Sequence, residues 1–253
     1  MGFADFKSRM LAGEILAGTF VKTPAYELIE VLAMSGLDFV CLDGEHAPFD
    51  RARLDACLAM ARALDFPTLV RVPSGAPENL LQALDSGAVG VVVPHVASVE
   101  IAEEVAKAAR FGHGGRGYAG STRWAGYATR PMDAVRAQEA ETLVIAQIEE
   151  PEAVDDIDRL AAVAGIDGLF LGPADLTVAY GGGAVAAEKL DAALAKVGAA
   201  AQAHGKAYMS FVPNAEKAAD WRKHGMTVFY VASEHGFMMS AARGAADGIH
   251  GLG

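Results

Sequence analysis

Residues 143–175 decide the fold: they begin Leu143-Val-Ile-Ala-Gln-Ile-Glu149 and end Gly168-Leu-Phe-Leu-Gly-Pro-Ala-Asp175. Both apolar runs have the length of a β-strand, and each ends in a carboxylate, Glu149 or Asp175. Residues 151–163 lie between them and start with proline, which suits a first helical turn. We therefore predict a strand–helix–strand unit, whose right-handed connection puts both strand ends on one rim.

Two carboxylates on neighbouring strand ends repel each other unless a cation lies between them. We therefore predict that Glu149 and Asp175 bind a divalent ion, because such ions take oxygen ligands and retain waters. The turn Gly172-Pro173-Ala174 offers backbone amides beside this site. The alternative is a pair of solvated acids, which is the commoner situation for an arbitrary pair.

The same alternation of strand and helix continues along the chain. Strand-like runs cover residues 15–20, 39–43, 68–72, 90–96, 143–149, 168–172, 207–212 and 227–232. Helix-like runs cover residues 25–34, 50–63, 77–85, 99–110, 151–163, 186–204, 214–223 and 237–246. Eight such alternations predict an α/β fold, a (β/α)₈ TIM barrel formed by one domain over residues 1–253. The alternative is a doubly wound sheet, but its Gly-x-Gly-x-x-Gly fingerprint does not follow the first strand.

Local signals support these boundaries. Asp50, Ser98 and Asn214 stand where helix N-caps belong. Gly36, Gly87, Gly205 and Gly225 follow helix-like runs, as left-handed C-caps do. The opening segment has helical spacing of its apolar residues and is predicted to cover one end of the barrel; these residues are Phe3, Phe6, Met10 and Leu11.

The composition argues against several classes of partner and location. The formal net charge of −11 disfavours nucleic acid and anionic membranes. No apolar run is long enough for a transmembrane helix, and no signal peptide is recognisable. The only two cysteines, Cys41 and Cys57, fit a reducing cytoplasm, and Cys41 is expected to be buried and inert.

In a (β/α)₈ barrel the functional residues lie at the carboxyl-terminal ends of the strands. The ends of the second and third strands supply Asp43, His46 and Arg71. His46 could instead be a surface imidazole, and Arg71 could simply pair with Asp43 or Glu45. His95 and His235 are expected to be walls of the pocket.

Asp85 is a separate case, because an acid at the end of a helix opposes the helix dipole. This placement suggests a cationic partner such as His46 or Arg71. A solvated helix end is an equally good interpretation.

Taken together, these motifs resemble the metal-dependent pyruvate aldolases of the hydroxy-oxo-heptanedioate and 2-dehydro-3-deoxyglucarate type. The resemblance rests on an ordered set of motifs: Leu42-Asp-Gly-Glu-His-Ala-Pro48, Val70-Arg-Val-Pro73, Arg116-Gly117, Arg123-Trp124, Gln147-Ile-Glu149 and Gly172-Pro-Ala-Asp-Leu176. It implies magnesium, manganese or cobalt on Glu149 and Asp175, a base at His46 and an enolate-binding Arg71. It also implies that Asp85 pairs with the histidine.

The resemblance completes the predicted site and assembly. The candidate catalytic residues are His46, Arg71, Asp85 and Asp43. The candidate substrate-binding residues are Phe20, Arg123, Gln147, Gly172, Pro173 and Ala174. The small-molecule partners implied are an oxo acid and an aldehyde. The assembly implied is a homo-oligomer, a hexamer in which the last helix packs on a neighbouring subunit. The alternative is that this helix covers the flank of its own barrel, as the eighth helix of a closed barrel does.

The expected reaction is cleavage of a 4-hydroxy-2-oxo acid to pyruvate, or a close analogue such as hydroxypyruvate, and an aldehyde. Three departures from the family pattern leave the aldehyde open: Phe20, the loop 180–183 and the strand end 233–236. Alternatives are a lyase acting on acyl-CoA or other oxo-acid substrates, a non-catalytic ligand-binding barrel, and a Schiff-base aldolase. The last needs a lysine in the pocket, and Lys206 precedes its strand and so points to the opposite rim.

Overall fold

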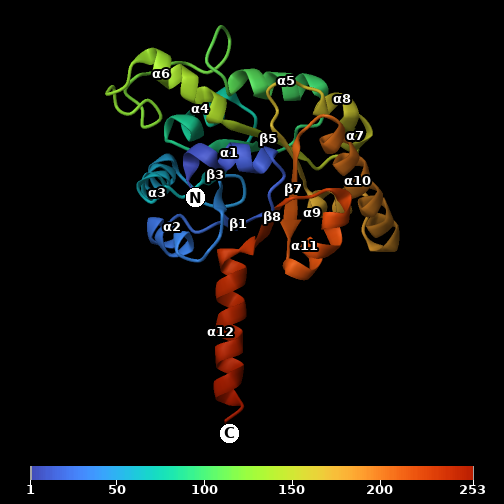
Figure 1. The fold of residues 1–253 in the computed structure, drawn as a ribbon. Coiled ribbons are helices and arrows are strands. Elements are labelled where there is room, and N and C mark those ends of the chain that lie inside the picture. The colour runs from blue at the N-terminus through green and yellow to red at the C-terminus, as the bar shows by residue number, and fades with distance from the viewer. Residues whose placement is uncertain (1, 253) are drawn as a thin grey trace.

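The computed structural model describes residues 2–252 and contains a closed barrel of eight parallel strands (Figure 1). The strands are β1 (Leu16–Val21), β2 (Phe39–Asp43), β3 (Thr68–Arg71), β4 (Gly90–Val93), β5 (Leu143–Ile148), β6 (Gly168–Leu171), β7 (Ala207–Val212) and β8 (Val228–Ser233). They pair in sequence order, and β1 pairs with β8 to close the ring. This closure confirms the (β/α)₈ prediction and excludes the doubly wound sheet.

One helix precedes the first strand, and the other helices lie between or after the strands along the chain. They are α1 (Phe3–Leu11), α2 (Tyr26–Ala33), α3 (Arg51–Ala63), α4 (Pro77–Asp85), α5 (Val99–Ala108), α6 (Met132–Ala137), α7 (Pro151–Asp155), α8 (Ile157–Ala161), α9 (Pro173–Ala179), α10 (Gly183–Ala203), α11 (Ala215–Trp221) and α12 (Glu234–His250), with 3₁₀ helices η1 (Gln138–Glu141) and η2 (Arg222–His224). Asp50, Ser98 and Asn214 accept N-cap hydrogen bonds as predicted. The helix predicted over residues 151–163 is interrupted at Asp156, whose backbone leaves the helical region between α7 and α8.

The amino-terminal end of the barrel is closed by α1. Phe3, Phe6 and Met10 are buried there, whereas Leu11, also expected to pack, is 43% exposed. The Phe6 ring lies 5.4 Å from that of Phe39, the first residue of β2, which places α1 beneath the strands. The opposite, carboxyl-terminal end is therefore left open for a site.

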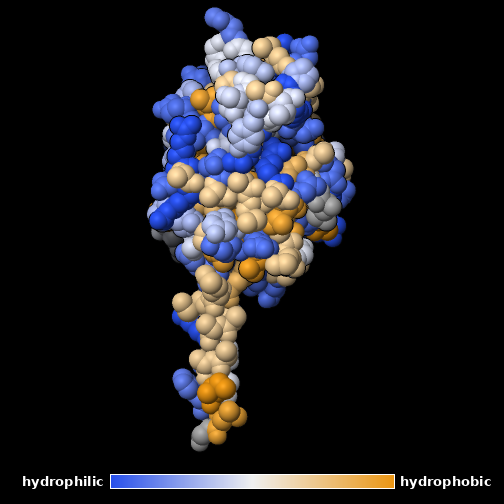
Figure 2. All heavy atoms as spheres, turned by 90° about the vertical axis from the view of Figure 1, so that its left-hand side faces the viewer, coloured by the Kyte–Doolittle hydropathy of each residue, from blue (hydrophilic) through white to orange (hydrophobic). Residues whose placement is uncertain are grey.

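Helix α12 departs from the expected arrangement of a barrel helix. It projects away from the barrel instead of covering its flank (Figure 1), and Glu234 is its only buried residue between Glu234 and His250. Apolar side chains lie bare along it and just beyond it (Figure 2); they are Phe237, Met238, Met239, Ile249 and Leu252. No helix between residues 2 and 252 has both the length and the apolar character that crossing a membrane requires.

Candidate active site

A pocket of about 450 Å³ opens at the carboxyl-terminal ends of the strands. Most of the candidate residues line it, namely Phe20, His46, Arg71, Gln147, Gly172, Pro173, Ala174 and Asp175. Asp43, Glu149, Asp85 and Arg123 do not form its wall. The strand ends thus bring a histidine, an arginine and an aspartate to one cavity, as the sequence predicted.

Arg71 is fixed at this pocket by Asp43, the last residue of β2. Its Nε donates to Asp43 Oδ1 at 3.0 Å and its Nη2 donates to Oδ2 at 2.8 Å. Burial by itself would raise the pKa of Asp43, but hydrogen bonds and charge from Arg71, together with Lys22, lower it to about 2. Asp43 therefore stays ionised at neutral pH and positions Arg71 from below the pocket.

His46 is the exposed histidine of the pocket wall. Its backbone N–H donates to Asp43 Oδ1 at 3.1 Å, which fixes the turn after β2. Its Nε2 lies 3.6 Å from Glu45 Oε2, and its side chain is 57% exposed. The imidazole can therefore exchange protons with a ligand or with solvent.

Glu149 follows β5 and is only 4% exposed. Burial raises the pKa of this carboxyl group, and the negative charge of Asp175 raises it further. A Cβ atom at Gly172 would come within 2.8 Å of Glu149 Cβ, so only glycine permits this approach of β6. A divalent cation fits this carboxylate pair, because it would offset both the burial and the repulsion.

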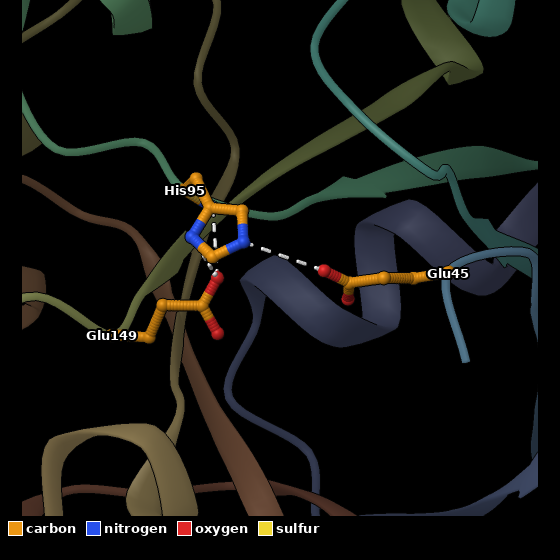
Figure 3. A group of neighbouring side chains, drawn as sticks. All are labelled: Glu45, His95 and Glu149. Atoms are coloured by element: carbon orange, nitrogen blue, oxygen red, sulfur yellow. Dashed lines mark hydrogen bonds and ion pairs between the residues drawn. The ribbon is translucent and has the colours of Figure 1, made fainter. Parts of the chain in front are cut away.

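A second group of potential metal ligands shares Glu149. Glu45, His95 and Glu149 bring ligand atoms within 4.8 Å of one another. Figure 3 shows the His95 imidazole between the two carboxylates. His95 was expected to be a pocket wall; instead it lies outside the pocket lining and faces these acids, because its backbone adopts a left-handed conformation (φ 57°).

Asp85 does not meet His46 or Arg71 within this chain. It ends α4, five residues before β4 begins, and therefore lies toward the amino-terminal rim, whereas His46 follows the far end of β2. Its cationic partner is Arg116, whose Nη2 lies 2.5 Å from Asp85 Oδ1. The proposed pairing of Asp85 with His46 or Arg71 is thus wrong for a single chain.

Arg123 also lies away from the pocket. Its Nη2 is 2.8 Å from Asp55 Oδ1, and its Nε donates to the carbonyl of Ser86. Asp85 and Arg123 instead line a separate hollow of about 440 Å³.

One residue at the pocket, Lys22, was missed by the sequence interpretation. Lys22 follows β1, lines the pocket and places Nζ 2.8 Å from Asp43 Oδ2. Glu234 begins α12 and accepts hydrogen bonds from the backbone N–H groups of Lys22 and Thr23. The position of Lys22 directly after the first strand was the signal that could have identified it.

Comparison with known proteins identifies the family. The model of the HpcH/HpaI aldolase/citrate lyase family matches residues 16–241. A hydroxypyruvate/pyruvate aldolase of Roseovarius nubinhibens is 34% identical over 206 residues, which cover 79% of this chain and 80% of that protein. A 5-keto-4-deoxy-D-glucarate aldolase of Enterobacter sp. (strain 638) is 32% identical over 244 residues, covering 96% and 95%.

A solved structure agrees with these sequence matches. The crystal structure of a family member from Burkholderia cenocepacia J2315 superposes with a TM-score of 0.91 at 31% identity, covering 98% of this chain and 99% of the other. The chain therefore belongs to the HpcH/HpaI aldolase/citrate lyase family and is a carbon–carbon lyase.

Proposed function

We propose that this protein catalyses the reversible aldol cleavage of 4-hydroxy-2-oxo acids to an aldehyde and pyruvate or hydroxypyruvate. The observation that carries the proposal is the pocket itself, where His46, Arg71 and Asp175 converge beside the buried Glu149. The names of the relatives, aldolases of hydroxypyruvate, pyruvate and a keto-deoxy sugar acid, support the same reaction.

Glu149 and Asp175 would hold a divalent ion, namely magnesium, manganese or cobalt. When bound, such an ion supplies Lewis acidity at the ketone of the oxo acid. The backbone N–H groups of Ala174 and Asp175, at the pocket wall, would donate to the substrate carboxylate. Phe20 and Phe170 form an apolar wall that excludes water from the reacting carbons.

In the cleavage direction, His46 would remove the proton of the C4 hydroxyl group. The C3–C4 bond then breaks, its electron pair moves toward C2 to form the enolate, and C4 leaves as an aldehyde. Arg71 would stabilise the negative enolate oxygen, because its guanidinium is permanently charged and fixed by Asp43. Protonation of the enolate at C3 gives pyruvate.

We infer the side of the pocket that receives the aldehyde from the residues that line it. Phe20 and the strand-end residues Ser233 and Gly236 line the pocket, whereas the loop 180–183 does not. These residues, together with Lys22, are therefore our candidates for contact with the aldehyde half of the substrate.

A Schiff-base mechanism is less well supported. Lys206 donates to the carbonyls of Val163 and Ile166 before β7 begins, at the opposite end of the barrel. Lys22 does line the pocket, but its Nζ is engaged by Asp43. Borohydride treatment with substrate is the discriminating measurement: a covalent adduct on Lys22 would replace the metal-dependent mechanism.

The direct test of function is a screen of 4-hydroxy-2-oxo acids for release of pyruvate or hydroxypyruvate, with and without a chelator. We expect release that depends on added divalent metal. Absence of cleavage across aliphatic, acidic and sugar-derived substrates would contradict the proposal.

Arg71 offers a sharper test of mechanism. Arg71→Lys is expected to lower turnover by roughly two to three orders of magnitude, nearly as much as Arg71→Ala, because an ammonium cannot reproduce the two-nitrogen contact with Asp43. Steady-state kinetics on the metal-loaded variants measures this loss. The matched control is Arg53→Lys, an exposed arginine of α3. If the lysine variant keeps most of its turnover, the guanidinium geometry is not required and Arg71 contributes only a positive charge.

The assembly belongs to the same proposal: copies of the chain associate through α12. An isolated helix of this length is marginal in water, and Gly236, Gly244 and Gly248 each weaken it by about 1 kcal/mol relative to alanine. A neighbouring subunit that covers Phe237, Met238 and Met239 would supply the missing stabilisation. A hexamer with exchanged helices is the arrangement that the family resemblance favours.

The hollow lined by Asp85 and Arg123 fits this assembly. Both residues were predicted to belong to the site, yet both lie outside the pocket of their own chain. Asp85 could meet a His46 only across a subunit interface.

Truncation before Phe237 is expected to give monomers with strongly reduced activity. The truncated chain keeps Ser233 and Gly236, so the loss would come from the missing association and not from a missing pocket residue. Light scattering and turnover measure the two effects together. Met239→Glu should weaken association, whereas Met34→Glu, at a methionine on the barrel that is even more exposed, should not. A full-length monomer with complete activity would contradict the proposal.

A further inference from the structure

The strongest unassigned feature is the Lys22 side chain, which follows β1 directly and lines the pocket. The register of β1 on β2 puts Lys22 beside Asp43. The register of β2 on β3 puts Asp43 beside Arg71. Three neighbouring strand ends therefore carry a lysine, an aspartate and an arginine side by side.

The backbone at Lys22 is held by a buried carboxylate. Both oxygens of Glu234 accept from the Lys22 N–H, at 2.9 and 3.1 Å, and its Oε1 also accepts from the Thr23 N–H at 2.6 Å. Glu234 is only 3% exposed. The end of β1 is thereby tied to the first turn of α12, so the lysine side chain starts from a fixed point of the rim.

The ammonium group of Lys22 is only partly used within the chain. Its Nζ donates to Asp43 Oδ2 at 2.8 Å, and among residues 2–252 this is its only hydrogen bond. An ammonium has three N–H donors, so two of them are free for a ligand. Arg71 already donates to both oxygens of Asp43, so the lysine is not needed to pair this carboxylate.

Lys22 and Arg71 face the pocket as a pair. Lys22 Nζ and Arg71 Nη2 donate to the same atom, Asp43 Oδ2, each at 2.8 Å. Two nitrogens bound to one oxygen are close neighbours, so one small substrate can reach both. In a 4-hydroxy-2-oxo acid the C2 and C4 oxygens are also close neighbours, because only C3 separates the carbons that bear them. If Arg71 binds the C2 oxygen, the C4 oxygen lies within reach of Lys22.

The lining of the pocket supports this assignment. Lys22 and Arg71 are the only lysine and arginine in it among the described residues. Ser233 and Gly236, on the side inferred for the aldehyde, belong to the turn that Glu234 ties to Lys22. With Arg71 assigned to the enolate, Lys22 is the remaining charged donor for the oxygen of the aldehyde half.

We propose that Lys22 is a further catalytic residue, whose ammonium group donates a hydrogen bond to the C4 oxygen and stabilises the alkoxide there. This role rests on the proposed aldol function and gives the C4 oxygen a charged partner. In cleavage, His46 takes the hydroxyl proton and Lys22 holds the alkoxide. The alkoxide electrons then form the aldehyde carbonyl as the C3–C4 pair moves toward C2. The lysine keeps its protons throughout, and in the addition direction it polarises the aldehyde carbonyl.

The experiment compares two reactions of the full-length, metal-loaded protein, of which only one involves a C4 oxygen. They are cleavage of 4-hydroxy-2-oxohexanoate, which releases uncharged propanal, and exchange of pyruvate methyl protons with deuterated water. Lys22→Met should lower kcat for cleavage by about two orders of magnitude, the usual effect of losing one oxyanion donor. The loss in cleavage should exceed the loss in exchange by at least about ten-fold. Lys22→Arg keeps a charged donor and should recover much of the cleavage.

Lys7→Met is the matched control. Lys7 Nζ lies 2.7 Å from Asp167 Oδ1, and Arg110 Nη2 lies 3.2 Å from Oδ2 of the same aspartate. This is the same lysine–aspartate–arginine arrangement at the opposite end of the barrel, so Lys7→Met should keep both rates near those of the wild type. Circular dichroism checks that all the variants are folded.

The contrary outcomes can be told apart. Equal losses of cleavage and exchange in Lys22→Met would mean that Lys22 acts only through Asp43 and Arg71. Unchanged cleavage of 4-hydroxy-2-oxohexanoate would remove Lys22 from the C4 oxygen and leave the aldol function intact, even if activity fell on substrates with an acidic aldehyde half. A wild type that exchanges protons but does not cleave this substrate would overturn the role of Lys22 alone. A wild type that neither cleaves any 4-hydroxy-2-oxo acid nor exchanges protons defeats the proposed function as well.

Discussion

Replacement of Glu149 by alanine is expected to abolish aldol cleavage and to leave the barrel folded. Glu149 is the buried member of the carboxylate pair, and burial already raises the pKa of its carboxyl group. Keeping this charge inside the protein therefore costs free energy that a bound cation would offset. Loss of the side chain should remove metal binding together with turnover.

Elemental analysis, turnover and circular dichroism together test this expectation. Glu149→Gln is the matched variant, because its amide oxygen can still accept from the His95 N–H while the charge is gone. Glu152→Gln, an exposed acid of α7, is the control for loss of one charge. Full activity of Glu149→Ala in a metal-free preparation would reject the carboxylate pair as the metal site.

His46→Ala is expected to lower turnover by about two to four orders of magnitude, the usual contribution of a positioned acid–base group. It should slow the exchange of pyruvate methyl protons with deuterated water to a similar degree, because enolisation needs the same base. The side chain is 57% exposed and its Nε2 lies 3.6 Å from Glu45 Oε2, so the fold should be unaffected.

Proton NMR of pyruvate in deuterated buffer follows the exchange directly. His113→Ala, at an exposed loop histidine, should exchange at the wild-type rate. If His46→Ala also keeps that rate, another group performs the enolisation, and His46 acts at most on the aldehyde side.

The barrel was predictable because the limits of single strands and helices agreed with the strand–helix alternation along the whole chain. The predicted strand limits 39–43 and 207–212 match β2 and β7. Helix ends followed the same logic, with Gly36 and Gly87 in the left-handed conformation that C-caps require. Barrel topology then placed His46, Arg71 and Asp175 on one rim, because parallel strands end together.

Other features of the fold and the site could not be predicted, because they depend on contacts between residues far apart in the sequence. The partner of Asp85 is an arginine in a long loop, and the sequence does not state how that loop folds back onto α4. The direction of the His95 ring depends on a left-handed backbone, which is uncommon at residues other than glycine. The direction of α12 was also left open, because an apolar last helix fits a barrel flank as well as a neighbour.

The amino-terminal end of α12 connects substrate binding to self-association, so the activity could depend on the concentration of the enzyme. Ala232, Ser233 and Gly236 form part of the pocket wall, and Glu234 ties the same turn to Lys22. If copies associate through the rest of α12, substrate affinity and self-association are linked, and linked equilibria are reciprocal. If an oxo acid binds the assembled protein more tightly than the monomer, its binding must strengthen the association of the subunits by the same factor. At low enzyme concentration and without substrate, the assembly would then dissociate into monomers. With substrate bound, it would remain assembled.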